Sequence, residues 1–172
     1  MQFTVEFQVD HLERALEAVR QEIATPQQML GSLGESLLQA NKERHEKGLA
    51  PDGTPWKERS PMTKSRRARL LYDNGDMLGS FNYQVQGSAL RLGFSDRKAI
   101  WHHGGTGTYA GGSPYTISPV KAKALHFGGM FRARVTHPGI PARPLVGFPA
   151  SDRQLVTDVI EDHLTLVLNR VR

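Results

Sequence analysis

The spacing of apolar residues changes along this chain, and that change limits the folds it can adopt. In residues 12–40 and 155–171, apolar side chains recur every three or four positions, which is typical of amphipathic helices. Residues 81–94 and 115–135 instead alternate apolar and polar side chains around glycine-containing turns, as β-hairpins do. A chain of this length has room for one main core. The sequence therefore predicts a single α+β domain over residues 1–172, with helices at both ends and hairpins between them.

Residue types at the ends of the helical segments indicate where each helix begins and stops. Asp10 opens a capping-box pattern directly after residues 3–9, whose alternating apolar side chains predict a half-buried strand. Thr25-Pro26 predicts the start of a second helix, and Gly48 predicts its end. Ser151 predicts the start of a C-terminal helix with a broad apolar face.

Glycine-rich segments divide the middle of the chain. Asn74-Gly75 predicts a tight turn into a short helical piece. The run over residues 104–113 lacks the GxxxxGK[ST] order of a phosphate-binding loop, so a flexible connection is the better interpretation. Together with the hairpin expected over residues 115–135, this run predicts a loop and hairpin over residues 104–137 that project from the body. Arginines and apolar side chains are expected on opposite faces of the return strand of that hairpin.

Charge is unevenly distributed, although the formal net charge is only +5. From Arg97 to Ser151 there are seven lysines and arginines and no aspartate or glutamate, while the terminal segments hold most of the acids. This asymmetry fits two kinds of partner equally well. One is a polyanion such as DNA, and the other is a second copy of this chain whose acidic face meets the basic one.

Few residues in the sequence suggest catalysis or metal binding. The chain has no cysteine, which excludes disulfides and thiolate chemistry and fits a reducing cytoplasm. His102, His103, His126 and His137 suggest zinc, but without an HExxH motif or nearby acids a turn with one histidine bonded to backbone is favoured, and a histidine-based metalloenzyme is the weakest alternative. We therefore expect no enzyme, metal or cofactor. A secretory signal, a membrane span and a membrane partner are also not expected.

A basic run follows the second predicted helix and continues into a short helix expected from Ser60. The run can contact phosphates through six side chains, Lys57, Arg59, Lys64, Arg66, Arg67 and Arg69. Trp56 is the only aromatic residue beside it, whereas stacking platforms for single strands usually need several. A solvated or intersubunit loop is favoured. A DNA-binding module that uses this run and the hairpin arginines remains the alternative.

The order of these motifs resembles the phage virion morphogenesis family of Mu-like tailed phages. The most specific pieces are Pro51-Asp52-Gly53-Thr54-Pro55-Trp56, Gly75-Asp76-Met77-Leu78 and Pro141-Ala142-Arg143-Pro144. Residues 117–139 are also similar to the hairpin of the related lambda-like tail-component family. A departure from that family's pattern is the insertion GTGTYAGGSP over residues 105–114, because many relatives pass more directly from the Trp-His stretch to the hairpin. The resemblance implies helices packed on a mixed or antiparallel sheet, and it brings no catalytic residues.

The same resemblance implies a structural virion protein that acts in tail completion or head-to-tail joining. We expect a ring of about six copies, a hexamer, at the neck or tail top of the virion, assembled in the bacterial host cytoplasm. Its expected partners are itself, neck or tail proteins such as the tail tube, terminator or head-closure proteins, and DNA in the channel. The residues expected at a subunit or partner interface are Trp56, Trp101, Lys121, Lys123, Phe131, Arg132, Arg134 and Arg143.

Arg143 stands alone among apolar residues in the proline-containing stretch 136–148. Prolines fix the backbone there and discourage pairing at an exposed edge, so this stretch reads as a return from the hairpin that anchors on the core through residues 145–148. Arg143 is expected to hold the turn by an ion pair or a bidentate hydrogen bond, either within the subunit or across an interface.

Overall fold

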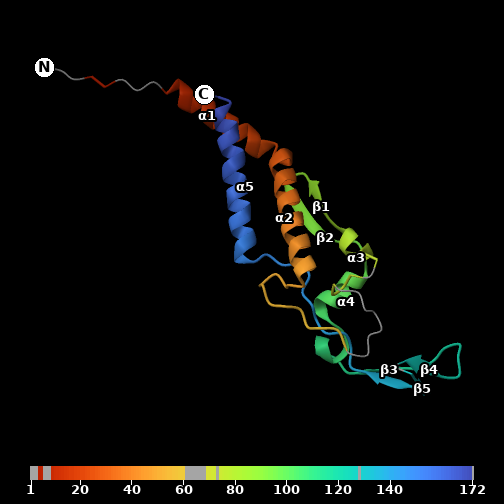
Figure 1. The fold of residues 1–172 in the computed structure, drawn as a ribbon. Helices are drawn as coiled ribbons and strands as arrows, with labels where there is room; N and C mark the ends of the chain where they lie inside the picture. Colours follow the sequence, from red (N-terminus) through yellow and green to blue (C-terminus); the bar gives the residue numbers. More distant parts are fainter. Residues whose placement is uncertain (1–3, 6–8, 61–68, 73, 128, 172) are drawn as a thin grey trace. The chain divides into compact units, whose positions relative to one another are not determined.

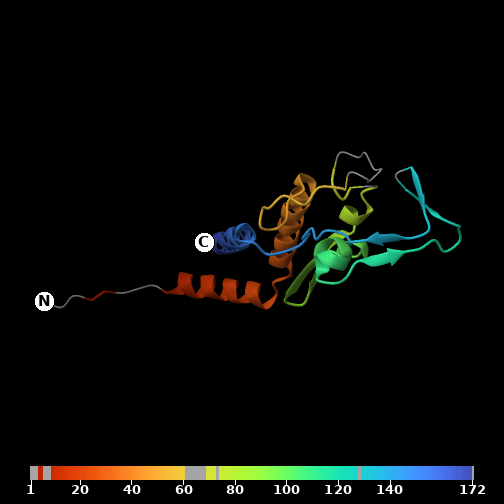
Figure 2. The ribbon, with the colours of Figure 1, turned by 90° about the horizontal axis from the view of Figure 1, so that it is seen from below.

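The structure, a computed structural model, describes residues 4–5, 9–60, 69–72, 74–127 and 129–171. The chain divides into two compact units, each considered by itself: the first comprises residues 1–38, 83–92 and 150–172, and the second comprises residues 39–82 and 93–149. Figures 1 and 2 show the elements in two views. The helix over residues 27–47 and the hairpin over residues 81–94 each contribute residues to both units. The single domain expected from the sequence stays a prediction. Most of the strand predicted over residues 3–9 lies outside the described residues.

The helices at the two ends of the chain are confirmed as α1 (Asp10–Ala24), α2 (Gln27–Lys47) and α5 (Ala150–Asn169). The capping role predicted for Asp10 is wrong, because Val9 is the N-cap of α1 and no side chain caps the helix there. Asp10 lies inside the first turn instead, where its carboxylate still favours the positive end of the helix dipole.

Gly48 ends α2 as predicted. Its φ of +70° is a left-handed conformation that glycine adopts without strain. The Gly48 N–H donates to His45 O at 3.1 Å and the Leu49 N–H donates to Arg44 O at 2.9 Å. This pair of bonds is the Schellman motif, which satisfies carbonyls that the last turn of the helix leaves without partners.

A close approach joins α2 to β1 (Phe81–Gln86), which pairs with β2 (Ala89–Phe94) in the predicted first hairpin. Gly34 is buried, and a Cβ atom placed on it would lie 2.3 Å from Cδ2 of Tyr83. Only glycine therefore lets the helix backbone lie against this ring. Burial alternates along β1 from Phe81 onward, so its apolar side chains share one face as predicted.

The half-buried side of α1 includes none of the leucines or isoleucines of this helix. The helix packs across α5 (Figure 1), and its half-buried residues Ala15, Ala18, Val19 and Glu22 follow helical spacing on one face. Glu22 Oε1 lies 2.7 Å from Nε2 of His163 on α5. No residue of α1 is buried. Its large apolar side chains are thus left in solvent.

The core of the second unit contains Ala50, Trp56, Met77, Ala99 and Leu145, with Leu70, Leu71, Phe94 and Val146 packed around it. Two short helices contribute to it, α3 (Asp76–Gly79) and α4 (Lys98–Gly104). The predicted turn before α3 is confirmed, since Gly75 is its N-cap with a φ of +88°. The short helix predicted from Ser60 lies outside the described residues.

The strands confirm the α+β class, but they form three separate antiparallel pairs rather than one sheet. In the second hairpin, β3 (Tyr115–Ile117) pairs with β6 (Val135–His137), and β4 (Leu125–Phe127) pairs with β5 (Met130–Arg132). Residues 118–124 separate β3 from β4, whereas only Ala133 and Arg134 separate β5 from β6. Pro119 has no N–H to donate to a ladder, which explains why the long first strand suggested by the alternation is interrupted.

The glycine-rich segment before this hairpin is not the flexible connection that we expected, at least over Gly105–Thr108. The N–H of Thr106 donates to Ile140 O at 2.9 Å, and the N–H of Thr108 donates to Pro138 O at 2.8 Å. A Cβ atom on Gly139 would lie 1.9 Å from Thr106 O. The glycines therefore serve close backbone packing, and a short 3₁₀ turn, η1 (Gly107–Ala110), follows.

Candidate interaction surface

Arg143 connects three separate segments of the second unit. Its side chain is buried, with 5% of its surface exposed. Nε donates to Lys57 O at 2.8 Å and Nη2 donates to Glu58 O at 3.0 Å, while its backbone N–H donates to His102 O at 2.6 Å. The bidentate hydrogen bond predicted for Arg143 is therefore present within the chain, and its acceptors are backbone carbonyls rather than a carboxylate.

Two further hydrogen bonds hold the same return segment. Nε1 of the buried Trp56 donates to Pro144 O at 2.8 Å, and the N–H of Leu145 donates to Nδ1 of His103 at 3.1 Å. Nδ1 of His137 likewise accepts from the N–H of Gly139 at 3.0 Å. The prediction that a histidine in this region bonds to the backbone is thus confirmed. We call Arg143, Trp56 and their backbone acceptors the return-segment junction.

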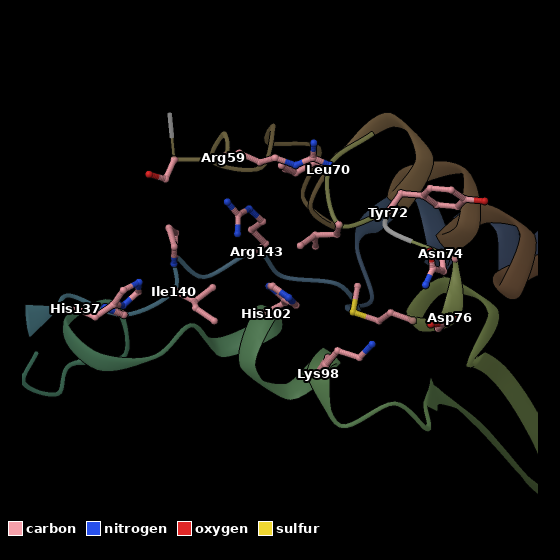
Figure 3. A pocket seen from close by; sticks show the side chains of 16 residues that line it. Arg59, Leu70, Tyr72, Asn74, Asp76, Lys98, His102, His137, Ile140 and Arg143 are labelled. Carbon is pink, nitrogen blue, oxygen red and sulfur yellow. The ribbon is translucent and has the colours of Figure 1, made fainter. Parts of the chain in front are cut away.

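A cleft of about 470 Å³ opens beside this junction (Figure 3). Its cationic side chains Arg59, Lys98 and Arg143 face one carboxylate, that of Asp76, among the described lining residues. Burial lowers the pKa of Arg143, and the positive charge of Arg59 lowers it further. Lys98 is paired with Asp96 at 3.2 Å and Arg59 donates to Arg69 O, so these cations are partly engaged within the unit.

His102 lines the same cleft and is held in its neutral form. Burial lowers the pKa of His102, and the charges of Arg143 and Lys98 act in the same direction. Its Nδ1 is buried and has no hydrogen-bond partner among the described residues. His45 in α2 is similar: burial lowers its pKa, and its ring meets that of Trp56 edge-on with centroids 5.1 Å apart.

A second cleft, of about 900 Å³, lies at the base of the hairpin in the same unit. Ile117, Leu125 and Val135 contribute apolar lining, and Lys57 also lines the cleft. Nζ of Lys57 lies 4.9 Å from the centroid of the Tyr109 ring, a cation–π contact. The hairpin base is therefore closed mainly by apolar and aromatic side chains.

The hairpin beyond this base is exposed. Phe131 has 73% of its surface in solvent, and it stacks on His126, the residue paired with it in the β4–β5 ladder, at a centroid distance of 4.6 Å. The four cations of the hairpin, Lys121, Lys123, Arg132 and Arg134, are exposed and form no ion pair with a described residue. A surface that combines an exposed aromatic ring with unpaired cations suits protein or polyanion contact.

The predicted interface residues do not form one surface. Trp56 and Arg143 lie inside the second unit and make their hydrogen bonds there, so their place on a partner surface stays a prediction. Trp101 is 48% exposed on α4. The hairpin brings together the remaining predicted residues, Lys121, Lys123, Phe131, Arg132 and Arg134.

The basic run is only partly described, because Lys64, Arg66 and Arg67 lie outside the described residues. Arg69 forms an ion pair with Glu46 at 3.0 Å and covers the ring of Tyr72, and Arg59 donates a hydrogen bond to Arg69 O. These two arginines of the run are thus engaged within the unit, while Lys57 contacts Tyr109.

In the described part of the chain, no three histidine, aspartate or glutamate side chains lie close enough to hold a metal ion. The described helices also include none that is long and apolar enough to cross a membrane.

The sequence did not predict one feature, the exposure of the apolar side of α1. Leu12, Leu16 and Ile23 are 57%, 61% and 65% exposed. The helical spacing of these residues was visible in the sequence, but their lack of a partner was not.

Comparison with known proteins agrees with the motif order. Neither the curated proteins nor the solved structures contain a significant match to this chain. The model of one protein family, described as the phage virion morphogenesis family, matches residues 7–165. That match spans both units and includes the return-segment junction and the hairpin. The chain therefore belongs to the phage virion morphogenesis family.

Proposed function

We propose that this protein is a structural subunit of a tailed-phage virion that acts in tail completion or head-to-tail joining. The observation that carries the proposal is the family match over residues 7–165. In this proposal the copies form a ring, a hexamer, at the neck or tail top, and the ring contacts other neck or tail proteins. Its work is adhesion, and no catalytic step is part of it.

The second unit supports this proposal through the contrast between its junction and its hairpin. Arg143 and Trp56 fix the return segment to the core by hydrogen bonds to backbone carbonyls. The hairpin leaves from that fixed base and exposes Phe131 together with four cations. A rigid base that presents an exposed ribbon suits contact with a neighbouring subunit or the tail tube, because less conformational entropy is lost on binding.

Deletion of the gene followed by complementation tests this proposal. Particles lacking the protein are expected to accumulate as unjoined heads and tails in electron micrographs, and mass spectrometry is expected to find the protein in wild-type particles. A hairpin variant, Phe131→Ser, is expected to lower the titre of infectious particles while leaving the thermal midpoint within a few degrees, because the ring is exposed.

Ile100→Ser is the matched control, since Ile100 is 72% exposed on α4 and lies outside the hairpin. We expect it to preserve the titre. Normal joining of heads and tails without the protein, together with its absence from particles, would contradict the proposal.

A DNA-binding module is the second candidate, because the chain has no acid between Arg97 and Ser151 and four hairpin cations are exposed. It predicts duplex binding whose log affinity falls steeply with log salt, and weakening by Arg66→Glu with Arg67→Glu. A titration without binding at about 50 mM salt, where screening is weak, would exclude this candidate.

A further inference from the structure

One face of α1 is apolar and has no partner among the described residues of its unit. Leu12, Leu16 and Ile23 lie on this face at helical spacing, each more than half exposed. The neighbouring face, with Ala15 and Ala18, is the half-buried one in this helix, which packs against α5. We call Leu12, Leu16 and Ile23 the α1 stripe. A row of exposed leucine and isoleucine side chains is typical of a surface that binds another protein.

The charges around this stripe are mainly acidic. α1 carries four carboxylates against two arginines, and one of those arginines, Arg20, is bound to Glu17 by two hydrogen bonds of 2.7 Å. These bonds from Arg20, with one from Gln21, lower the pKa of Glu17 to about 2. Glu13 lies three residues before Leu16, and so beside it on the helix surface, and forms no ion pair with a described residue. Glu22 contacts His163 at 2.7 Å, and Arg14 is an exposed cation of the same helix, so the margin of the stripe is acidic on balance.

The hairpin over residues 115–137 has the opposite character. It exposes Phe131 by 73% and Val120 by 95%, and it carries Lys121, Lys123, Arg132 and Arg134 without any acid. Apolar side chains and cations on the hairpin thus match the apolar side chains and carboxylates on α1. Complementary charge of this kind selects a partner and its orientation, while apolar burial stabilises the contact.

We propose that the hairpin of one copy binds the α1 stripe of a neighbouring copy. The contact is heterologous, since each copy contributes its hairpin to one neighbour and its α1 stripe to the other. Contacts of this type generate a closed ring when the rotation between copies closes. The inference rests on the proposed function and deepens it by assigning both surfaces of the contact between subunits.

Disulfide trapping tests the pairing directly, because the chain has no cysteine of its own. Two full-length variants, Leu16→Cys and Phe131→Cys, are each purified, mixed and oxidised, and the products are separated by electrophoresis without reductant. Complemented particles that contain both variants are treated in the same way. We expect a covalent dimer in the mixture and in the particles, and at least a tenfold lower yield with either variant alone.

Leu166→Cys replaces Leu16→Cys in the matched control. Leu166 is 59% exposed on α5 of the same unit, against 61% for Leu16. We expect little trapping between Leu166→Cys and Phe131→Cys. Equal yields from the two pairs, or no dimer in either the mixture or the particles, would overturn the proposed pairing. Trapping of Leu16→Cys to a different virion protein would also overturn it, because that protein would then be what covers the stripe.

Charge reversal provides a second test. Arg132→Glu on the hairpin is expected to reduce the yield of trapped dimer severalfold, and Glu13→Lys on the partner copy is expected to restore part of it. An unchanged yield in the first variant would overturn the charge argument. Native mass spectrometry of the same samples separates failure of this pairing from failure of the proposed function. Rings that form without trapping contradict the pairing alone. Absence of the protein from particles contradicts the proposed function.

Discussion

The indole of Trp56 donates a hydrogen bond from Nε1 to the carbonyl oxygen of Pro144, 2.8 Å away and 88 residues later in the chain. Both residues belong to the motifs PDGTPW and PARP, which carry the resemblance to the family. The two motifs thus meet in the folded protein. Arg143 beside Pro144 reinforces the meeting with its two bonds to Lys57 and Glu58.

Trp56→Phe is expected to lower the free energy of unfolding by about 1–3 kcal/mol, because a hydrogen bond and part of a buried ring are lost. Denaturant unfolding followed by circular dichroism measures the change. Trp101→Phe is the control, since Trp101 is 48% exposed, and its effect is expected to stay within about 0.5 kcal/mol. Equal effects of the two substitutions would show that the bond to Pro144 contributes nothing.

Arg143→Lys is expected to destabilise the protein by about 1–3 kcal/mol, although it keeps the charge. An ammonium group cannot reproduce the fork that reaches Lys57 O and Glu58 O together. Arg134→Lys serves as the control, because Arg134 is exposed and pairs with no described residue. If both lysine variants unfold at the wild-type denaturant concentration, the bidentate geometry has no structural role.

Stability is expected to fall as the pH drops below about 6.5, the ordinary pKa of histidine. Burial lowers the pKa of His45 and of His102 in the folded state, so the unfolded chain binds more protons between the folded and unfolded values. The free energy of unfolding therefore keeps its full value above the pKa of the unfolded-state histidines. It decreases as the pH falls from that pKa toward the lower pKa of the folded state. Each histidine contributes a slope of up to about 1.4 kcal/mol per pH unit.

His45→Phe checks the source of that pH dependence. Phenylalanine retains an edge contact with Trp56 and cannot take up a proton, so the slope between about pH 5 and 6.5 is expected to decrease. Unfolding midpoints at a series of pH values measure it. His11→Gln, at an exposed position of α1, is the histidine substitution with which it is compared. A wild-type slope in His45→Phe would assign the titration to other groups.

Two glycines of α2 are expected to respond in opposite ways to substitution by alanine. Gly31→Ala places its Cβ in open space and is expected to stabilise the protein by about 0.5–1 kcal/mol through higher helix propensity. Gly34→Ala forces its Cβ against the ring of Tyr83 and is expected to destabilise it. Thermal unfolding of the pair compares them within one helix. Stabilisation by both would contradict the close approach of α2 to β1.

Much of the local structure of this protein was determined by the sequence alone. Helical spacing placed α1, α2 and α5, Gly48 stopped α2, and alternation placed both hairpins. These features depend on dihedral preferences and on side chains a few positions apart, which neighbouring residues specify. The bidentate role of Arg143 was also predictable, because a lone arginine among apolar residues needs hydrogen-bond acceptors when it is buried.

Only the tertiary structure decided which partners those residues meet. It assigned the backbone carbonyls of Lys57 and Glu58 to Arg143, packed Gly105–Thr108 against the return segment, divided the long hairpin into two ladders, and left the α1 stripe in solvent. Periodicity shows that a face is apolar, but burial depends on which distant segment covers it. That outcome comes from packing between residues far apart in the chain, and for the α1 stripe we propose that the covering segment belongs to another copy.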